Sequence, residues 1–110
     1  MATLSAQQMS RSGLEPSYTS AAGGGDEFVN TGEEFIHIKN GDGSSHTVTI
    51  ETPNLVDGLA IADRAVAIPG GEERMIGPFP TSTYNDANQK VQLTYDAVTS
   101  VTIAIIKHGS

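Results

Sequence analysis

Hydrophobic and polar residues alternate along most of the chain from Glu33 onward. Alternation with period two is typical of β-strands that bury one face and expose the other. Turn-forming residues separate the alternating runs about every eight to twelve positions. We expect six strands, at residues 34–40, 47–51, 64–68, 73–76, 90–95 and 101–107. The pattern predicts an all-β fold, either a single antiparallel β-sandwich or a small, jelly-roll-like barrel.

The alternation also predicts which side chains are buried. In the first strand, Phe35 and His37 share one face, and Ile36 and Ile38 share the other. In the last strand, Ile106 points away from the predicted core. The residues expected to face the core in the other strands are Val48, Ile50, Val91, Leu93, Tyr95, Val101, Ile103 and Ile105.

Glycine, proline and asparagine mark the connections between these runs. Residues 40–45 contain the Gly, Asn and Asp that a β-hairpin loop needs, so we expect a hairpin between the first two strands. Residues 69–71, Pro-Gly-Gly, predict a type II turn. Residues 54–67 fit either a helix or a loop followed by a strand. We favour the loop and strand, because Asp57 and Gly58 would interrupt a helix at its second turn.

The N-terminal part of the chain has a different composition, since Ser, Ala, Gln and Gly dominate residues 1–25. We interpret this stretch as an extended N-terminal arm that ends in a glycine-rich hinge at residues 23–25, and residues 26–110 as the β-sandwich domain. The arm is expected to add a strand to the sheet edge of a neighbouring subunit, and a frayed terminus is the alternative. Its candidate partner contacts are Leu4, Leu14 and Tyr18.

Composition and charge exclude several classes of protein. The chain has no Cys, so disulfide frameworks, zinc ribbons, iron–sulfur sites and thiol catalysis are ruled out. Its formal net charge of −7 argues against direct binding of nucleic acid. Apolar runs are too short for a membrane span, and residues 1–20 lack the apolar core of a secretory signal. We therefore expect no nucleic-acid partner and no membrane partner.

The acidic excess lies in the first part of the chain. Residues 1–63 hold nine of the 13 acidic residues with two basic ones, whereas residues 64–110 hold four of each. We expect the near-neutral second part to supply more of any contact surface. A contact surface rich in Asp and Glu from the first part would contradict this expectation.

Candidate chemistry is sparse. A twelve-residue window imitates the spacing of a calcium-binding loop, but its sixth position is Ser45 instead of Gly and its flanks read as strands. We therefore favour an ordinary loop over a calcium site. The three histidines fall in unrelated segments, and no G-x-S-x-G nucleophile motif is present. No catalytic, cofactor-binding or metal-binding residues are predicted. The window residues are Asn40, Asp42, Ser44, His46 and Glu51, and the histidines are His37, His46 and His108.

The most distinctive segment is a corner rich in proline and aromatic residues, at residues 76–86. Two prolines and two aromatic residues define it more tightly than a solvent loop requires. Either it plugs one end of the sandwich or it forms a contact surface, because rigid aromatic side chains bury large areas at low entropic cost. Its candidate contacts are Pro78, Phe79, Pro80 and Tyr84.

Several motifs together carry a family resemblance over about residues 28–106. They are Val29-Asn30-Thr31-Gly32, Phe35-Ile36-His37-Ile38-Lys39-Asn40, Thr47-Val48-Thr49-Ile50, Thr52-Pro53, Ile68-Pro69-Gly70-Gly71-Glu72-Glu73-Arg74-Met75-Ile76-Gly77-Pro78-Phe79-Pro80, Tyr84-Asn85-Asp86 and Val91 to Tyr95. In these motifs the chain resembles small virion proteins that tailed bacteriophages encode among their head genes.

The resemblance implies a capsid decoration (cement) protein with a β-sandwich or barrel fold and no catalytic residues. Such a protein is made in the host cytoplasm and binds the major capsid protein on the outer surface of the head, often as a homotrimer. Another head component or a head-to-tail component is the alternative within the same resemblance.

A different class of function also fits the residues. A small β-sandwich can recognise carbohydrate or a host surface, here through Tyr84, Phe79 and the loop at residues 40–46. Binding to a glycan array would favour this alternative, whereas co-sedimentation with capsids would favour the decoration protein. An enzyme is the remote third option.

Overall fold

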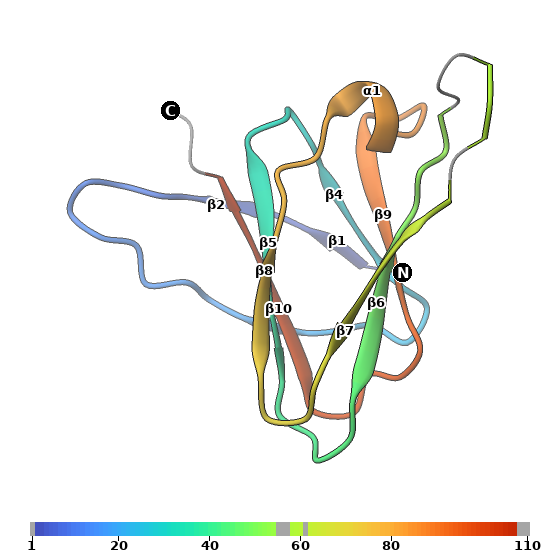
Figure 1. The fold of residues 1–110 in the computed structure, drawn as a ribbon. Coiled ribbons are helices and arrows are strands. Elements are labelled where there is room, and N and C mark those ends of the chain that lie inside the picture. Colours follow the sequence, from blue (N-terminus) through green and yellow to red (C-terminus); the bar gives the residue numbers. More distant parts are fainter. Residues whose placement is uncertain (1, 55–57, 61, 108–110) are drawn as a thin grey trace.

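The computed structural model describes residues 2–54, 58–60 and 62–107, which form two packed β-sheets and one short helix (Figure 1). The first sheet has the strand order β1 (Ala2–Leu4), β4 (Asp26–Val29), β9 (Lys90–Tyr95), β6 (His46–Ile50) and β7 (Arg64–Ile68). The second has the order β2 (Ala6–Gln8), β10 (Val101–Lys107), β5 (Glu34–Asn40) and β8 (Glu73–Ile76), with β3 (Thr19–Ser20) also paired to β10. Helix α1 is the single turn Thr81–Tyr84. The predicted all-β sandwich is confirmed.

The alternating pattern placed the strands accurately. Five of the six predicted strands have the predicted bounds, and the sixth is shifted by one residue to His46–Ile50. The strand β4 was not predicted, because its inward-facing residues are Asp26 and Phe28. A buried carboxylate in place of one apolar residue conceals the period of two.

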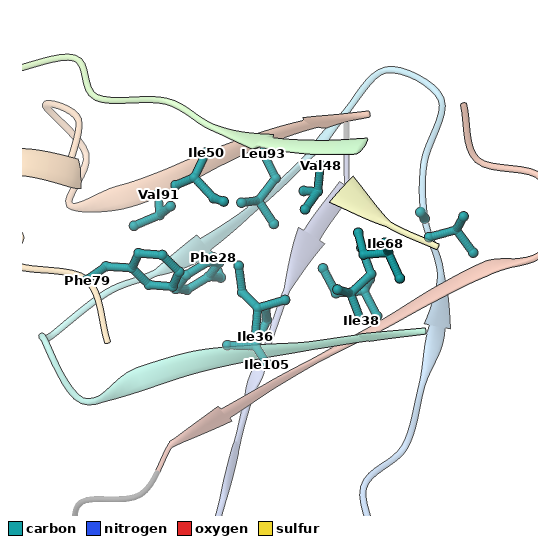
Figure 2. Close-up of a cluster of buried hydrophobic side chains, with 13 residues drawn as sticks. Phe28, Ile36, Ile38, Val48, Ile50, Ile68, Phe79, Val91, Leu93 and Ile105 are labelled. Atoms are coloured by element: carbon teal, nitrogen blue, oxygen red, sulfur yellow. The ribbon is translucent and has the colours of Figure 1, made fainter. Parts of the chain in front are cut away.

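Inward-facing side chains of both sheets form one core (Figure 2). In β5 every second residue is buried, which confirms the predicted alternation and shows that Ile36 and Ile38, and not Phe35 and His37, face the core. Tyr95, also expected to face the core, packs against it and is partly buried. Ile106 points away from this core, yet only 4% of its surface is exposed. The core residues are Phe28, Ile36, Ile38, Val48, Ile50, Ile68, Phe79, Val91, Leu93, Val101, Ile103 and Ile105, with Ala21 at its margin.

The predicted hairpin between β5 and β6 is wrong, because these strands lie in different sheets. Their connection is held by the side chain of Asn40, whose Nδ2 donates to the carbonyls of Ser44 (2.8 Å) and Ile68 (2.9 Å). Neither Gly41 nor Gly43 has the positive φ that a tight hairpin turn demands. The loop residues between β5 and β6 therefore reverse the direction of the chain, but they do not determine which strands pair.

The turn at residues 69–72 joins β7 to β8 and contains a left-handed glycine, but it is shifted by one residue from the predicted type II turn, because Pro69 takes its first position and not its second. Gly71 has a φ of 75°, and the Glu72 N–H donates to the Pro69 carbonyl at 3.1 Å. This turn also crosses from one sheet to the other. In the ambiguous stretch before β7, residues 58–60 and 62–63 are not helical, and residues 55–57 and 61 lie outside the described residues.

The N-terminal segment forms edge strands on its own chain. β1 pairs in parallel with β4, β2 pairs in parallel with β10, and β3 pairs antiparallel with β10. These parallel pairs make both sheets mixed instead of purely antiparallel. Ser5 links β1 to β2, so one extended segment passes from the edge of the first sheet to the edge of the second. The addition of this arm to a neighbouring subunit stays a prediction.

Candidate interaction surface

The proline-rich corner is built around Phe79, which is 2% exposed. Its ring packs against Phe28, with centroids 6.0 Å apart, and against Tyr84 at 5.2 Å in an edge-on arrangement. Figure 2 shows Phe79 beside Phe28 at one end of the core. Phe79 is therefore a plug and does not offer its ring to a partner in this conformation. The prediction that it contacts a partner or a sugar is corrected, whereas Pro78 and Pro80 are exposed and Tyr84 is half-buried.

Asparagine side chains fasten this corner to the sheets. Asn30 Nδ2 donates to the Phe79 carbonyl (2.9 Å) and to Asn85 Oδ1 (2.7 Å), and Asn85 Nδ2 donates back to the Asn30 carbonyl (2.9 Å). Asn54 Nδ2 donates to the Asn85 carbonyl at 2.7 Å. Sequence reasoning did not assign roles to Asn30 and Asn54, although both lie in the motifs that carry the resemblance or next to them. Their amides join loops that are far apart in the sequence.

Asp86, next to this network, organises the turn that leads into β9. Burial raises its pKa, but the backbone N–H of Lys90, the Gln92 amide and the Asn88 N–H outweigh burial and hold the pKa below the usual value. The Asp86 carboxylate accepts all three hydrogen bonds at 2.8–3.0 Å. These contacts give the Tyr-Asn-Asp motif a structural role at the end of the sandwich.

The arm candidates contact the arm's own subunit. Leu4 is half-buried, packs against the core and is aligned with Phe28 in the β1–β4 pair. Leu14 is half-buried in the segment between β2 and β3. Tyr18 lies on the outer face of the second sheet, where its hydroxyl bonds His37 Nδ1 at 2.6 Å and Lys39 Nζ sits 4.0 Å from its ring centroid. The structure thus keeps Tyr18 apart from Tyr84, which lines a groove between the sheets.

A buried carboxylate anchors the hinge between arm and domain. Asp26 is fully buried, and its Oδ2 accepts hydrogen bonds from the Tyr95 hydroxyl (2.7 Å) and the Ala22 N–H (3.2 Å). Burial and the neighbouring Asp26 charge raise the pKa of Tyr95 above its usual value. Gly25 has a φ of 97°, and a Cβ there would lie 2.6 Å from the Leu93 carbonyl oxygen. Residues 22–26 are consequently held in one defined turn.

On the remaining open side of the sandwich, residues of β7 and β8 line a groove. Figure 1 shows the course of these two strands. Its volume is about 360 Å³, and its lining combines apolar and cationic side chains. Among the described strands, β7 and β8 are the terminal strands of their sheets, so each has one free edge. The principal lining residues are Arg64, Val66, Arg74, Ile76, Phe79 and Tyr84.

Two arginines occupy inward-facing positions of these edge strands. Arg64 is paired with the buried Ile50 and Arg74 with the buried Ile38, and residues opposite each other in a sheet share a face. Arg74 Nη1 bonds Glu72 Oε1 at 3.1 Å. Arg64 is exposed and forms no ion pair with any side chain of the described ranges. The signal in the sequence is an arginine in phase with the apolar residues of each strand, and neither arginine was predicted to have a role.

The histidines do not converge. His37 Nε2 bonds Glu73 Oε1 at 2.8 Å, while His46 Nε2 bonds Asp42 Oδ2 at 2.9 Å in the loop after β5. The hydrogen bond from His46, followed by that from the Gly43 N–H, holds the pKa of Asp42 below its usual value. His108 lies outside the described residues. Within residues 2–54, 58–60 and 62–107, no three His, Asp or Glu side chains are placed to hold a metal ion.

In the described part of the chain, the single helix is one turn long, and no helix is long and apolar enough to span a membrane. Comparison with known proteins adds no relative. No protein family, curated protein sequence or solved structure matches this chain significantly.

Proposed function

We propose that this chain is a non-enzymatic structural protein of a phage virion, which binds the outer surface of the capsid and stabilises the head. What carries this proposal is the resemblance of several motifs to small head-gene proteins, above all Gly77-Pro78-Phe79-Pro80 and Tyr84-Asn85-Asp86. Their contacts support it, because these motifs lock a corner of the sandwich. A protein that acts through the shape of its surface needs such rigid corners.

The N-terminal segment supports attachment to neighbouring subunits. It already pairs with sheet edges through short strands of two or three residues, and it ends at a glycine-containing turn at residues 22–25. Strands this short contribute few hydrogen bonds, so the same segment can exchange onto another subunit's edge at small cost. In the assembled head we propose a homotrimer in which Leu4, Leu14 and Tyr18 contact neighbours. The partner on the shell is the major capsid protein.

Stabilisation of the head then requires no chemistry from this chain. A ligand that binds the assembled shell and not its dissociated subunits raises the stability of the shell by mass action. Each bound copy adds contacts across subunit boundaries. The near-neutral part, residues 64–110, is proposed to supply more of this contact surface than the acidic part.

Electron microscopy of heads assembled with and without this chain tests the proposal. We expect regularly spaced density on the outside of the shell that disappears when the gene is deleted and returns when purified chain is added. Heads that lack the chain should release their DNA at a lower temperature. Density confined to the neck would move the chain to the head-to-tail junction, and its absence from purified heads would contradict the proposal.

Two variants test the arm within the same assay. Deleting residues 1–20 is expected to abolish binding to heads, and unchanged binding would refute a role for the arm. Because the deletion also exposes the edge of β10, a milder variant is needed. Leu14→Ser leaves all strand pairs in place and is expected to weaken binding while the circular dichroism spectrum is unchanged.

A polar hollow gives the carbohydrate alternative a specific basis. It has a volume of about 560 Å³, and hydroxyl, amide and carboxylate side chains line it. However, the amides of Asn30, Asn54 and Asn85 already donate to neighbouring loops, which leaves few donors for sugar hydroxyls. Tyr84 lines the β7–β8 groove instead of this hollow. Selective retention on a glycan array, lost on Thr81→Val, would favour this second function over the first.

A further inference from the structure

We propose that the β7–β8 groove binds an extended, acidic segment of a partner protein, which adds as a strand to the free edge of β7. The segment places a carboxylate between Arg64 and Arg74 and apolar side chains over Val66 and Ile76. This inference concerns the isolated chain and does not depend on the proposed role in a phage head.

The backbone of β7 offers hydrogen-bonding groups to such a segment. In β6, the Thr47 carbonyl accepts from the Asp96 N–H, and the Glu51 N–H after the strand donates to the Gln92 carbonyl. The odd-numbered residues of β6 therefore direct their backbone groups toward β9, and Val48 directs its own toward β7. Since Val48 is paired with Val66, the N–H and C=O groups of Ala65 and Ala67 point to the free edge.

The opposite side of the molecule shows that an extended segment fits such a position. There, residues 2–8 pass along the edges of both sheets, forming β1 beside β4 and β2 beside β10. β7 and β8 are the equivalent edges on the other side, and no described strand covers them. The groove between them has apolar walls for the inward side chains of an added strand.

Charge selects an acidic segment and favours β7 over β8. Arg64 is exposed and forms no ion pair within the described ranges. The edge of β8 instead carries two carboxylates, Glu73 in the strand and Glu72 immediately before it. An acidic segment along β8 would meet those two carboxylates. A carboxylate beside β7 meets Arg64, and it can compete with Glu72 for Arg74, which is bonded at 3.1 Å.

Inward-pointing charge on an edge strand also has a simpler explanation, protection against aggregation. That explanation accounts for Arg64 but predicts no preference among added segments. Small side chains at Ala65 and Ala67 leave the outer face of β7 accessible, and Met75 on β8 is 64% exposed. Selective binding distinguishes a docking edge from a protected one.

The test begins with a displayed library of random eight-residue peptides, selected on the wild-type chain and counter-selected on Arg64→Glu/Arg74→Glu. We expect enriched peptides to carry Asp or Glu between β-branched residues. The most enriched peptide is then synthesised, and its binding is measured by fluorescence anisotropy. The double variant should bind it at least about tenfold more weakly, and a peptide with Glu replaced by Lys should regain affinity for the double variant.

Backbone pairing has its own readout. Amide hydrogen exchange should slow at Ala65 and Ala67 when the peptide binds. Ala67→Pro removes an outward N–H donor without touching the β6 ladder, so it should weaken binding, whereas the matched control Ala67→Ser should not. Circular dichroism and urea unfolding of each variant confirm that the fold is intact.

Several outcomes would overturn the proposal. They are no enrichment, enriched peptides that bind wild type and the double variant equally, and protection at β8 instead of β7. Sedimentation at rising protein concentration tests a second copy as the occupant. Self-association that Arg64→Glu abolishes would assign the groove to another copy of this chain and would equally refute the acidic partner.

Discussion

Both lateral sides of the sandwich consist of β-strands, but the strand edges are covered on one side and free on the other. On one side, β1, β2 and β3 cover the edges of β4 and β10, and the outward-facing Ile106 of β10 is buried. On the other, β7 and β8 end their sheets with free edges, and the outward-facing Met75 is 64% exposed. The covered side uses a segment of the chain itself, whereas the open side keeps two arginines in a groove.

This difference separates stability from recognition within one small domain. A covered edge gains buried apolar area and paired backbone groups, and while the arm is in place it leaves no free backbone groups for an added strand. An open edge keeps unpaired groups and charge, which cost stability but support binding. Substitutions on the covered side should therefore change the free energy of unfolding, and those on the open side should chiefly change binding.

The largest contrast is expected between two outward-facing apolar residues. Ile106→Ala leaves a cavity on the covered side and should lower the free energy of unfolding by about 2–4 kcal/mol. Met75→Ala on the open side should change it by less than about 0.5 kcal/mol. Urea unfolding monitored by circular dichroism measures both. Equal losses for the two variants would show that the sides do not differ as described.

The hinge next to the covered side should give the next largest effect. Tyr95→Phe removes the 2.7 Å hydrogen bond to Asp26, whose Oδ1 has no partner among the described residues. The buried carboxylate then keeps one donor, so we expect a loss of about 1–3 kcal/mol. Asp26→Asn in the Tyr95→Phe background should recover part of it. If Tyr95→Phe leaves the free energy of unfolding unchanged, this contact does not hold the hinge.

A smaller loss is expected where the arm meets the outer face of the second sheet. Tyr18→Phe removes the 2.6 Å hydrogen bond to His37 but keeps the ring below Lys39, so we predict about 0.5–1.5 kcal/mol. Faster amide exchange confined to β3 and its neighbours would accompany it. Exchange that accelerates equally in β7 would contradict a local role.

Acid should loosen the covered side by a modest amount. Hydrogen bonds from Gln92, Thr3 and Lys90, in that order of effect, hold the pKa of Glu27 below its usual value of 4.5. Because the folded-state pKa is the lower one, this contribution is present above about pH 4.5 and is lost as pH falls through the folded value. Amide exchange in β1 should rise over that interval, and Glu27→Gln should remove the dependence. If the pH dependence of amide exchange in β1 is unchanged by Glu27→Gln, another carboxylate is responsible for it.

Prediction from sequence succeeded where the information is local. The strand β5 could be placed because Ile36 and Ile38 alternate with less buried residues, and the turn glycine Gly71 follows from its neighbours. Prediction failed for β4, where the buried Asp26 is stabilised by the distant Tyr95. It also left the role of Phe79 open, since the choice between a plug and a contact surface depends on Phe28, which is 51 positions away.

The amino-acid sequence by itself determined the fold class, the strands after residue 33 and the faces of most of them, because a period of two reports burial at each strand separately. Only the tertiary structure decided which strands are neighbours, how residues 2–8 cover one side, and that Arg64 and Arg74 line the same groove. Strand pairing and side-chain convergence depend on contacts between residues far apart along the chain. No local pattern encodes these contacts, and packing of the whole molecule selects among them.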